Sequence, residues 1–269
     1  MPKAAVNGVS INYRVRGQGE PLVLIMGYSG PGAAWWFQER AFARHFRVVT
    51  FDNRGVGKSD KPEGPYTTAM MGDDAVGLMD HLGIDKAHVM GVSMGGLISQ
   101  ELALNHPDRV MKLVLGCTYA GRDEESGFSA HLVRALHGRE DYTDDDIRDI
   151  PIGKLTNALV SLSFSRRLYR LIVVPLAKLG IRLGGTKGLG GQLEACLGHN
   201  ALDRLSTIQA PTLVIAGTGD RIILPGSSDV LASKIPNAKL VKVEGGSHSF
   251  FVEMRGKFNR EVMGFLRGD

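Results

Sequence analysis

Cysteine is scarce in this sequence. The chain of 269 residues contains only Cys117 and Cys196. A framework of disulfide bonds needs more cysteines than this, and isolated thiols are typical of proteins kept in a reducing compartment. We therefore expect two reduced, buried thiols in a protein with a cytoplasmic location.

Long apolar runs are also missing. The first residues, Met1-Pro2-Lys3-Ala4, lack the apolar core of a signal peptide. No stretch reaches the roughly 18 apolar residues that a membrane span requires. Leu171–Leu179 comes nearest, but it is short and has basic residues around it. The sequence predicts no stable membrane insertion.

The first 120 residues contain no cluster of Lys and Arg, although the net charge of the chain is +4. Because nucleic-acid-binding proteins concentrate basic residues on one face, we expect no nucleic-acid partner. The middle of the chain differs. Residues 123–149 carry nine carboxylates, whereas residues 151–193 carry none and have seven Lys or Arg. A solvated face explains that basic stretch, and attraction of anionic substrates or of a membrane surface is the alternative.

Glycine is abundant, and one glycine motif has a chemical meaning. Gly91, Ser93 and Gly95 form G-x-S-x-G, the pattern of a serine held on a sharp turn between a strand and a helix. A short motif arises by chance in a chain with 35 glycines, so its context decides. The apolar run Ala87–Met90 precedes the motif as a strand, and Leu97–Leu104 follows it at helical spacing. The sequence therefore predicts a strand, a turn and a helix around Ser93.

Buried strands and helices alternate along both ends of the chain. The predicted strands are Ala4–Val6, Val9–Val15, Leu22–Met26, Phe46–Phe51, Ala87–Met90, Met111–Leu115, Thr212–Ala216 and Lys239–Val243, and the predicted helices include Ala33–His45, Thr67–Leu82, Gly226–Lys234 and Phe258–Leu266. Asn7-Gly8 predicts a hairpin between the first two strands. The alternation predicts right-handed crossovers and a largely parallel sheet. It breaks at Gly121, where leucine-rich helical segments follow, and it resumes at Pro211.

Two later strand ends carry the partners that a serine nucleophile needs. A serine hydroxyl requires a base within hydrogen-bond distance, and the base requires an orienting acid. Asp220 follows one strand and His248 follows the next, and the carboxyl ends of parallel strands meet at one edge of a sheet. We therefore expect Ser93, Asp220 and His248 to form the catalytic group. Helix capping is the alternative role of Asp220, and Asp123 is the reserve acid.

Acyl transfer also needs donors for the carbonyl oxygen that becomes negatively charged. The backbone N–H of Met94, at the start of the helix, is one candidate. The backbone N–H of Tyr28 is the other, because its glycine-rich loop follows the Leu22–Met26 strand. A simple tight turn is the alternative explanation of that loop.

The glycines of Asp52–Ser59 do not match a phosphate-binding motif or the dinucleotide fingerprint, so we expect a structural turn near Ser93. Cys196 and His199 are too few to hold zinc. We therefore predict neither a metal site nor a cofactor.

With these residues in place, the chain resembles the α/β-hydrolase family over essentially its whole length. The resemblance rests on Gly91–Gly96, Asp52–Ser59, Gly217–Asp220 and Gly246–His248. It implies an α/β fold with a mostly parallel eight-stranded sheet flanked by helices. It further implies a core domain of residues 1–120 and 201–269 and a helical cap, or lid, inserted at residues 121–200.

Within the family, the chain is similar to carboxylesterases, enol-lactonases, cofactor-free haloperoxidases and carbon–carbon bond hydrolases. The loop Gly30–Ala33 is similar to that of the carbon–carbon group, but this group usually has Asn where the chain has Val92 and Trp where it has Ser249. Met26 replaces a His that many relatives carry. Ser93 itself argues against haloalkane dehalogenases, which use Asp there.

We therefore predict a serine esterase that cleaves small to medium, largely apolar carboxylic esters through an acyl-enzyme intermediate. The partner is a small-molecule ester, and the oligomeric state is left open. Trp35 and Trp36 are candidate walls of the substrate pocket, with a core role as the alternative for each. Alternative activities are a carbon–carbon bond hydrolase or enol-lactonase of aromatic degradation and a perhydrolase or haloperoxidase that uses the same triad. A binding module without catalysis is the third class.

Overall fold

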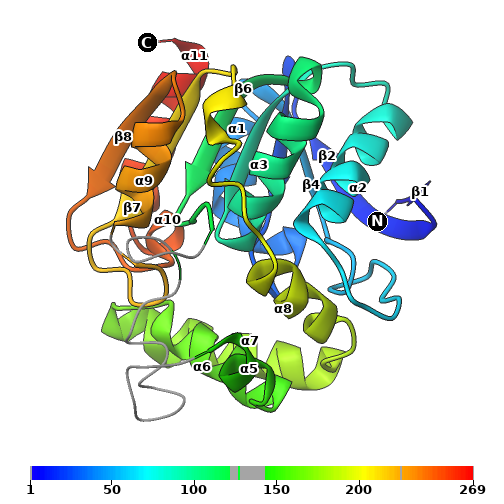
Figure 1. Ribbon diagram of the computed structural model, residues 1–269, viewed down its shortest axis with the longest axis vertical. Coiled ribbons are helices and arrows are strands. Elements are labelled where there is room, and N and C mark those ends of the chain that lie inside the picture. Colours follow the sequence, from blue (N-terminus) through cyan, green and yellow to red (C-terminus); the bar gives the residue numbers. More distant parts are fainter. Residues whose placement is uncertain (1, 122–126, 128–142, 225, 269) are drawn as a thin grey trace.

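The chain forms an eight-stranded sheet in a computed structural model that describes residues 2–121, 127, 143–224 and 226–268 (Figure 1). The strands run in the order β1-β2-β4-β3-β5-β6-β7-β8. Their bounds are β1 (Lys3–Val6), β2 (Val9–Arg16), β3 (Glu20–Ile25), β4 (Phe46–Phe51), β5 (Ala87–Val92), β6 (Val110–Gly116), β7 (Thr212–Gly217) and β8 (Ala238–Val243). Each predicted strand is therefore confirmed to within two residues at either end.

The sheet is parallel except at one edge. β1 pairs with β2, and β2 with β4, in antiparallel register, whereas every other neighbouring pair is parallel. Asn7 and Gly8 join the first two strands with positive φ angles of 47° and 75°, the geometry of a tight hairpin turn. The prediction of a mostly parallel sheet with an N-terminal hairpin is confirmed.

Helices cover both faces of the sheet, which explains why the central strands are continuous apolar runs. One face carries α2 (Thr68–His81), α3 (Met94–Asn105) and α9 (Ser227–Lys234). The other carries the 3₁₀ turn η1 (Gly32–Trp35), α1 (Trp36–Phe42), α10 (Phe250–Glu253) and α11 (Arg255–Arg267). Short 3₁₀ turns, η2 (Pro107–Arg109) and η3 (Leu205–Thr207), precede β6 and β7.

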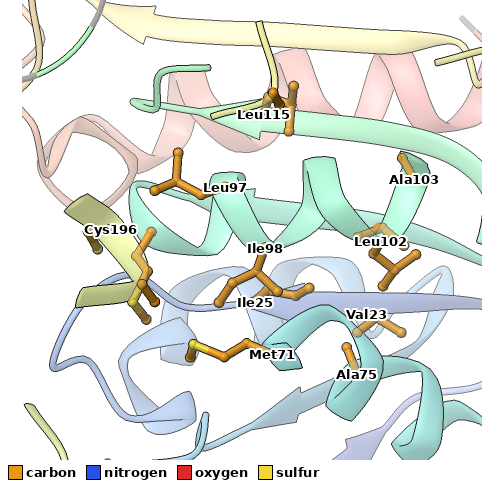
Figure 2. Close-up of a cluster of buried hydrophobic side chains, with 14 of the residues drawn as sticks. Val23, Ile25, Met71, Ala75, Leu97, Ile98, Leu102, Ala103, Leu115 and Cys196 are labelled. Atoms are coloured by element: carbon orange, nitrogen blue, oxygen red, sulfur yellow. The ribbon is translucent and has the colours of Figure 1, made fainter. Parts of the chain in front are cut away.

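The helix α3 is enclosed in the core. Figure 2 shows one buried cluster that contains Ile98 and Leu102 of α3, Met71 and Ala75 of α2, and Val23 and Ile25 of β3. All residues from Met94 to Ala103 are buried. A fully buried Leu or Ile contributes roughly 2 kcal/mol relative to an exposed one, so this packing holds α3 firmly against the sheet. The residue at the start of α3 is fixed with it.

Further helices lie between β6 and β7, at one end of the sheet (Figure 1). They are α5 (Asp144–Arg148), α6 (Ile152–Leu162), α7 (Arg167–Gly184) and α8 (Leu189–Leu197). We call α5–α8 the inserted helices. Leu193, Cys196 and Leu197 of α8 belong to the same buried cluster as α2 and α3, whereas much of α7 is exposed. The domain boundaries at residues 121 and 200 stay a prediction.

The segment Ala33–His45 and the two cysteines were both predicted from the sequence. The single helix expected at Ala33–His45 is instead a 3₁₀ turn followed by an α-helix that ends at Phe42. Cys117 and Cys196 are free and buried, as expected. In the part of the chain that the structure describes, no helix combines the length and the apolar character needed to cross a membrane.

Candidate active site

Ser93 occupies the turn between β5 and α3 with a strained backbone. Its φ of 54° and ψ of −126° fall in a region that residues with a side chain rarely adopt. Such strain persists only where the surroundings enforce it, and here β5 on one side and the buried α3 on the other do so. The turn projects the serine away from both elements at the carboxyl end of the sheet.

The glycines on either side of Ser93 are required by close packing. A Cβ on Gly91 would collide with the carbonyl oxygen of Gly95, and a Cβ on Gly95 would collide with the carbonyl oxygen of Ile25. Backbone therefore contacts backbone at both positions, and only glycine fits there. Thr118 adds a hydrogen bond of 2.8 Å from its hydroxyl to the Ser93 carbonyl oxygen.

His248 and Asp220 form a hydrogen-bonded pair. The Nδ1 atom of His248 lies 2.7 Å from Oδ2 of Asp220, and both side chains are buried. The other oxygen of Asp220 accepts from the amides of Ile222 and Ile223 at 2.8 and 3.1 Å. An ionised carboxylate only accepts hydrogen bonds, so the neutral imidazole carries its proton on Nδ1. The Nε2 atom is then free to accept a proton.

Ser93 and His248 face the same cavity. Within the described residues, however, no hydrogen bond joins the Ser93 hydroxyl to the imidazole. Catalytic hydrogen bonds are often long before substrate binds and shorten in the reacting complex. The three predicted residues thus come from the ends of three strands to one edge of the sheet, with the Asp–His contact formed.

The glycine-rich loop after β3 lies against the serine. A Cβ on Gly27 would come within 3.1 Å of the Ser93 Cβ atom, so the backbone of this loop contacts the turn that carries Ser93. In the described part of the chain, neither the Tyr28 nor the Met94 backbone N–H donates a hydrogen bond. Two free amides beside a serine are what an oxyanion hole requires.

The loop Asp52–Ser59 supports the glycine-rich loop from below. One carboxylate oxygen of Asp52 accepts from the Gly32 amide at 2.8 Å, and the other accepts from the Lys58 amide at 2.8 Å. Asn53 donates to the Met26 carbonyl oxygen at 2.9 Å. The interpretation of this segment as a structural turn near Ser93 is confirmed.

The inserted helices brace the same loop from the other side. The hydroxyl of Thr156, on α6, donates to the Ile152 carbonyl oxygen, and its oxygen lies 3.2 Å from the Tyr28 hydroxyl. Burial raises the pKa of the Tyr28 phenol, which therefore keeps its proton and donates to Thr156. Gln192, on α8, is fully buried and accepts from the Ser29 amide at 2.9 Å. Its side-chain NH₂ donates to the Arg54 carbonyl oxygen at 2.8 Å.

A buried glutamate joins the histidine loop to α7. Glu253 accepts hydrogen bonds from the hydroxyl of Ser247 at 2.5 Å and from the backbone amide of Arg166 at 2.7 Å. Ser165 donates to the same carboxylate through its hydroxyl and its amide. One carboxylate therefore caps the start of α7 and also holds the residue next to His248.

The cavity in front of Ser93 has a volume of about 460 Å³, ordinary for a small-molecule site. The sheet loops form its floor, and the inserted helices contribute Leu159, Val160, Val173, Ala177, Ile181 and Leu193 to its walls. Among the described residues that line it there is no Asp, Glu, Lys or Arg. A charged group would therefore be desolvated there without an ionic partner.

The two tryptophans have different positions. Trp36 lines the cavity and is half exposed, whereas Trp35 is fully buried against Phe251 at a ring distance of 5.4 Å. Trp35 is therefore not a wall of the pocket, because the 3₁₀ turn rotates it into the core. Asp123, the reserve acid, lies outside the described residues. No group of three or more potential metal-ligating side chains occurs among the residues described.

Sequence reasoning missed Thr156, Gln192 and Glu253. Each acts across more than 80 residues of chain or through a backbone partner, and none belongs to a local motif. The available signal was Gln192 itself, which follows Gly190 and Gly191 in a largely apolar helix, since a buried amide side chain needs hydrogen-bond partners.

Comparison with known proteins is consistent with this geometry. The family model described as alpha/beta hydrolase fold matches residues 20–254. The chain therefore belongs to the α/β-hydrolase family, and its fold and family define it as a hydrolase. Three relatives show how varied that family is.

An enol-lactonase from Burkholderia xenovorans LB400 superposes with a TM-score of 0.85 at 30% identity, covering 99% of this chain and 100% of its own. A meta-cleavage product hydrolase from Pseudomonas fluorescens IP01 gives 0.81 at 27% identity, with coverage of 100% and 98%. A proposed carbamate hydrolase, RutD, from Caulobacter sp. (strain K31) is 32% identical, with 93% of this chain and 91% of the relative covered.

Proposed function

We propose that the protein is a serine hydrolase that cleaves carboxylic esters with an uncharged, largely apolar acyl group. One observation carries the proposal: Ser93 and His248, which Asp220 orients, face a cavity whose described lining residues include no Asp, Glu, Lys or Arg. The serine is the nucleophile, the histidine is the base and the aspartate orients the histidine.

In the first half of the reaction, Ser93 Oγ attacks the ester carbonyl while His248 Nε2 takes the hydroxyl proton. The Asp220 carboxylate stabilises the imidazolium that forms. The amides of Tyr28 and Met94 donate to the developing oxyanion. His248 then gives the proton to the leaving alcohol, and the acyl group stays on Ser93.

In the second half, water replaces the alcohol. His248 removes a proton from the water as it attacks the acyl carbonyl, and the tetrahedral intermediate again uses the two amides. Collapse returns the proton to Ser93 and releases the carboxylic acid. The product carries a negative charge in a cavity that offers it no described cationic partner, which favours its release.

A lactone is a cyclic ester and undergoes the same steps, so lactone hydrolysis is the second candidate. The enol-lactonase relative supports it. For carbon–carbon cleavage, the meta-cleavage relative argues in favour, whereas Val92 and Ser249 depart from the residues usual in that group. Carbamate hydrolysis, suggested by the RutD relative, is a further acyl transfer that the same groups could perform.

The test measures one panel of uncharged p-nitrophenyl esters, lactones, carbamates and meta-cleavage products with the wild type and with Ser93→Ala. We expect ester hydrolysis that falls by several orders of magnitude in the variant. Mass spectrometry after treatment with a fluorophosphonate should find the label on Ser93 alone. Ester turnover that survives in Ser93→Ala would overturn the proposal.

Three other results would favour a different function. Preferred turnover of a meta-cleavage product would favour carbon–carbon hydrolysis, and peroxide-dependent halogenation above the ester rate would favour a perhydrolase. Absence of both turnover and labelling would favour a binding module.

A further inference from the structure

The helix α7 has two apolar faces. Tyr169, Val173, Ala177 and Ile181 line the cavity. A second stripe points to solvent: Leu168, Leu171, Ile172, Leu176 and Leu179 are 65%, 65%, 52%, 63% and 49% exposed. Leucines spaced three and four residues apart form one continuous face of a helix. A single exposed leucine is ordinary on a protein surface, but a continuous apolar stripe indicates an interaction surface.

Basic residues follow one edge of this stripe. Arg167, Lys178 and Arg182 are separated by 11 and 4 residues, close to whole numbers of helical turns, so they lie in one row. None of them forms an ion pair with a carboxylate in the described part of the chain. No acidic residue occurs in residues 151–193. Among the described residues, this row of positive charge therefore has no carboxylate that neutralises it.

The rim of the cavity extends the same character beyond α7. Trp36 and Phe37 are both exposed and both line the cavity. The guanidinium of Arg40 lies 4.8 Å from the Trp36 ring and that of Arg255 lies 4.5 Å from the Phe37 ring. Arg255 also donates to the Tyr169 hydroxyl at 2.8 Å, which links this rim to α7. Tryptophan is favoured at the boundary between lipid and water, because its ring is apolar at one end and polar at the other.

We propose that the outer face of α7, with Trp36 and Phe37, docks on an anionic lipid surface. The helix lies in the plane of the headgroups, with its leucines among the acyl chains and its basic row on the phosphates. The cavity behind α7 then opens beside the layer into which apolar esters partition. Docking itself does not depend on which bond Ser93 cleaves.

A lipid surface suits these observations better than a second copy of the chain. A two-fold contact would place the same patch of each copy against the other, and residues 151–193 would bring no negative charge to the basic row. A lipid layer offers negative charge and apolar depth together, and it requires no matching groove.

The experiment is co-sedimentation of the full-length protein with vesicles of phosphatidylcholine alone or with about 30 mol % phosphatidylglycerol. We expect binding to the anionic vesicles only. Because three basic residues contribute about tenfold or less each at such a surface, Arg167→Gln/Lys178→Gln/Arg182→Gln should bind roughly 100-fold more weakly. Raising the salt from about 0.1 to about 1 M should weaken the wild type in the same direction.

A second variant and a matched control separate the apolar contribution to vesicle binding from the electrostatic one. Leu171→Gln/Leu176→Gln should lose binding at unchanged charge. Arg44→Gln/Lys86→Gln/Lys239→Gln removes the same charge from exposed positions elsewhere and should bind like the wild type. Hydrolysis of a water-soluble ester should not change in any variant, which keeps this test independent of the proposed function.

Two outcomes would overturn the proposal. One is equal binding by the wild type and both α7 variants. The other is a dimer in light scattering that Leu171→Gln/Leu176→Gln dissociates, with no binding to either vesicle, because the stripe would then join two copies of the chain.

Discussion

The loops at the end of the sheet and the inserted helices form one cavity but are built differently. On the sheet side, backbone contacts and several hydrogen bonds hold each group, as at Ser93 and Asp220. On the helical side, α6 and α7 contribute apolar walls and expose much of their surface. The two sides meet through Thr156, Gln192 and Glu253. The contrast indicates that bond cleavage depends on the sheet, whereas the choice of substrate depends on the helices.

Asp220→Asn tests the sheet side and should have the largest effect. The carbonyl oxygen of the new side chain would keep the hydrogen bonds from the Ile222 and Ile223 amides, which turns its NH₂ group toward Nδ1. The imidazole then carries its proton on Nε2, the wrong tautomer, and kcat should fall about 10⁴-fold with KM little changed. Stopped-flow or steady-state ester hydrolysis measures this, with Asp229→Asn at an exposed position as control. A loss below about tenfold would remove Asp220 from the triad.

The second effect concerns stability at the junction of α8 and the sheet. Burial lowers the pKa of His199 to about 4, with Glu101 opposing and Arg204 adding to the shift. Because the pKa is about 6.5 in the unfolded chain, the unfolded state binds the proton first as pH falls. The free energy of unfolding should therefore drop by about 2 kcal/mol between pH 7 and pH 5.

Urea unfolding followed by circular dichroism at the two pH values measures this drop. His199→Gln should lose less stability over the same range, and His106→Gln, at a partly exposed position, should behave like the wild type. An unchanged drop in His199→Gln would show that another group binds the proton.

Ala177→Trp tests the helical side. The added ring fills the part of the cavity next to α7, so kcat/KM for long acyl esters should fall roughly 20-fold while acetate esters keep their rate. Asn157→Trp places the same ring on the exposed face of α6 as control. Equal losses for short and long esters would mean that α7 does not select the acyl chain.

Glu253→Gln tests the contact between the His248 loop and α7. It should have the smallest effect on turnover, a decrease of about fivefold in kcat. The amide keeps one acceptor but loses the charge that Ser247 and the Arg166 amide share. A residue that only stabilised the fold would lower the melting temperature without changing kcat of the folded fraction. Kinetics well below that temperature, beside Glu244→Gln, distinguish the two.

The sheet side was readable from the sequence because its residues follow strands. The run of apolar residues ends at Ser93, at Asp220 and shortly before His248, and a parallel sheet brings such ends together. The position of Trp35 was not readable, since one 3₁₀ turn decides whether it faces the core or the cavity. The role of Glu253 was not readable either, because two of its partners, Ser165 and Arg166, lie 88 and 87 residues away in the chain.

The hydrogen bonds of Gln192 determine which of the inserted helices can be exchanged with those of a relative without disturbing catalysis. Gln192 holds the Ser29 amide and the Arg54 carbonyl oxygen at once, so α8 supports the backbone on which the Tyr28 amide depends. A chimaera that exchanges α5–α7 with a relative but keeps Thr156 should keep its turnover and acquire a new substrate range. A chimaera that also exchanges α8 would replace Gln192 and its hydrogen bonds to the glycine-rich loop that carries the Tyr28 amide. For protein engineering, α8 therefore belongs with the catalytic core.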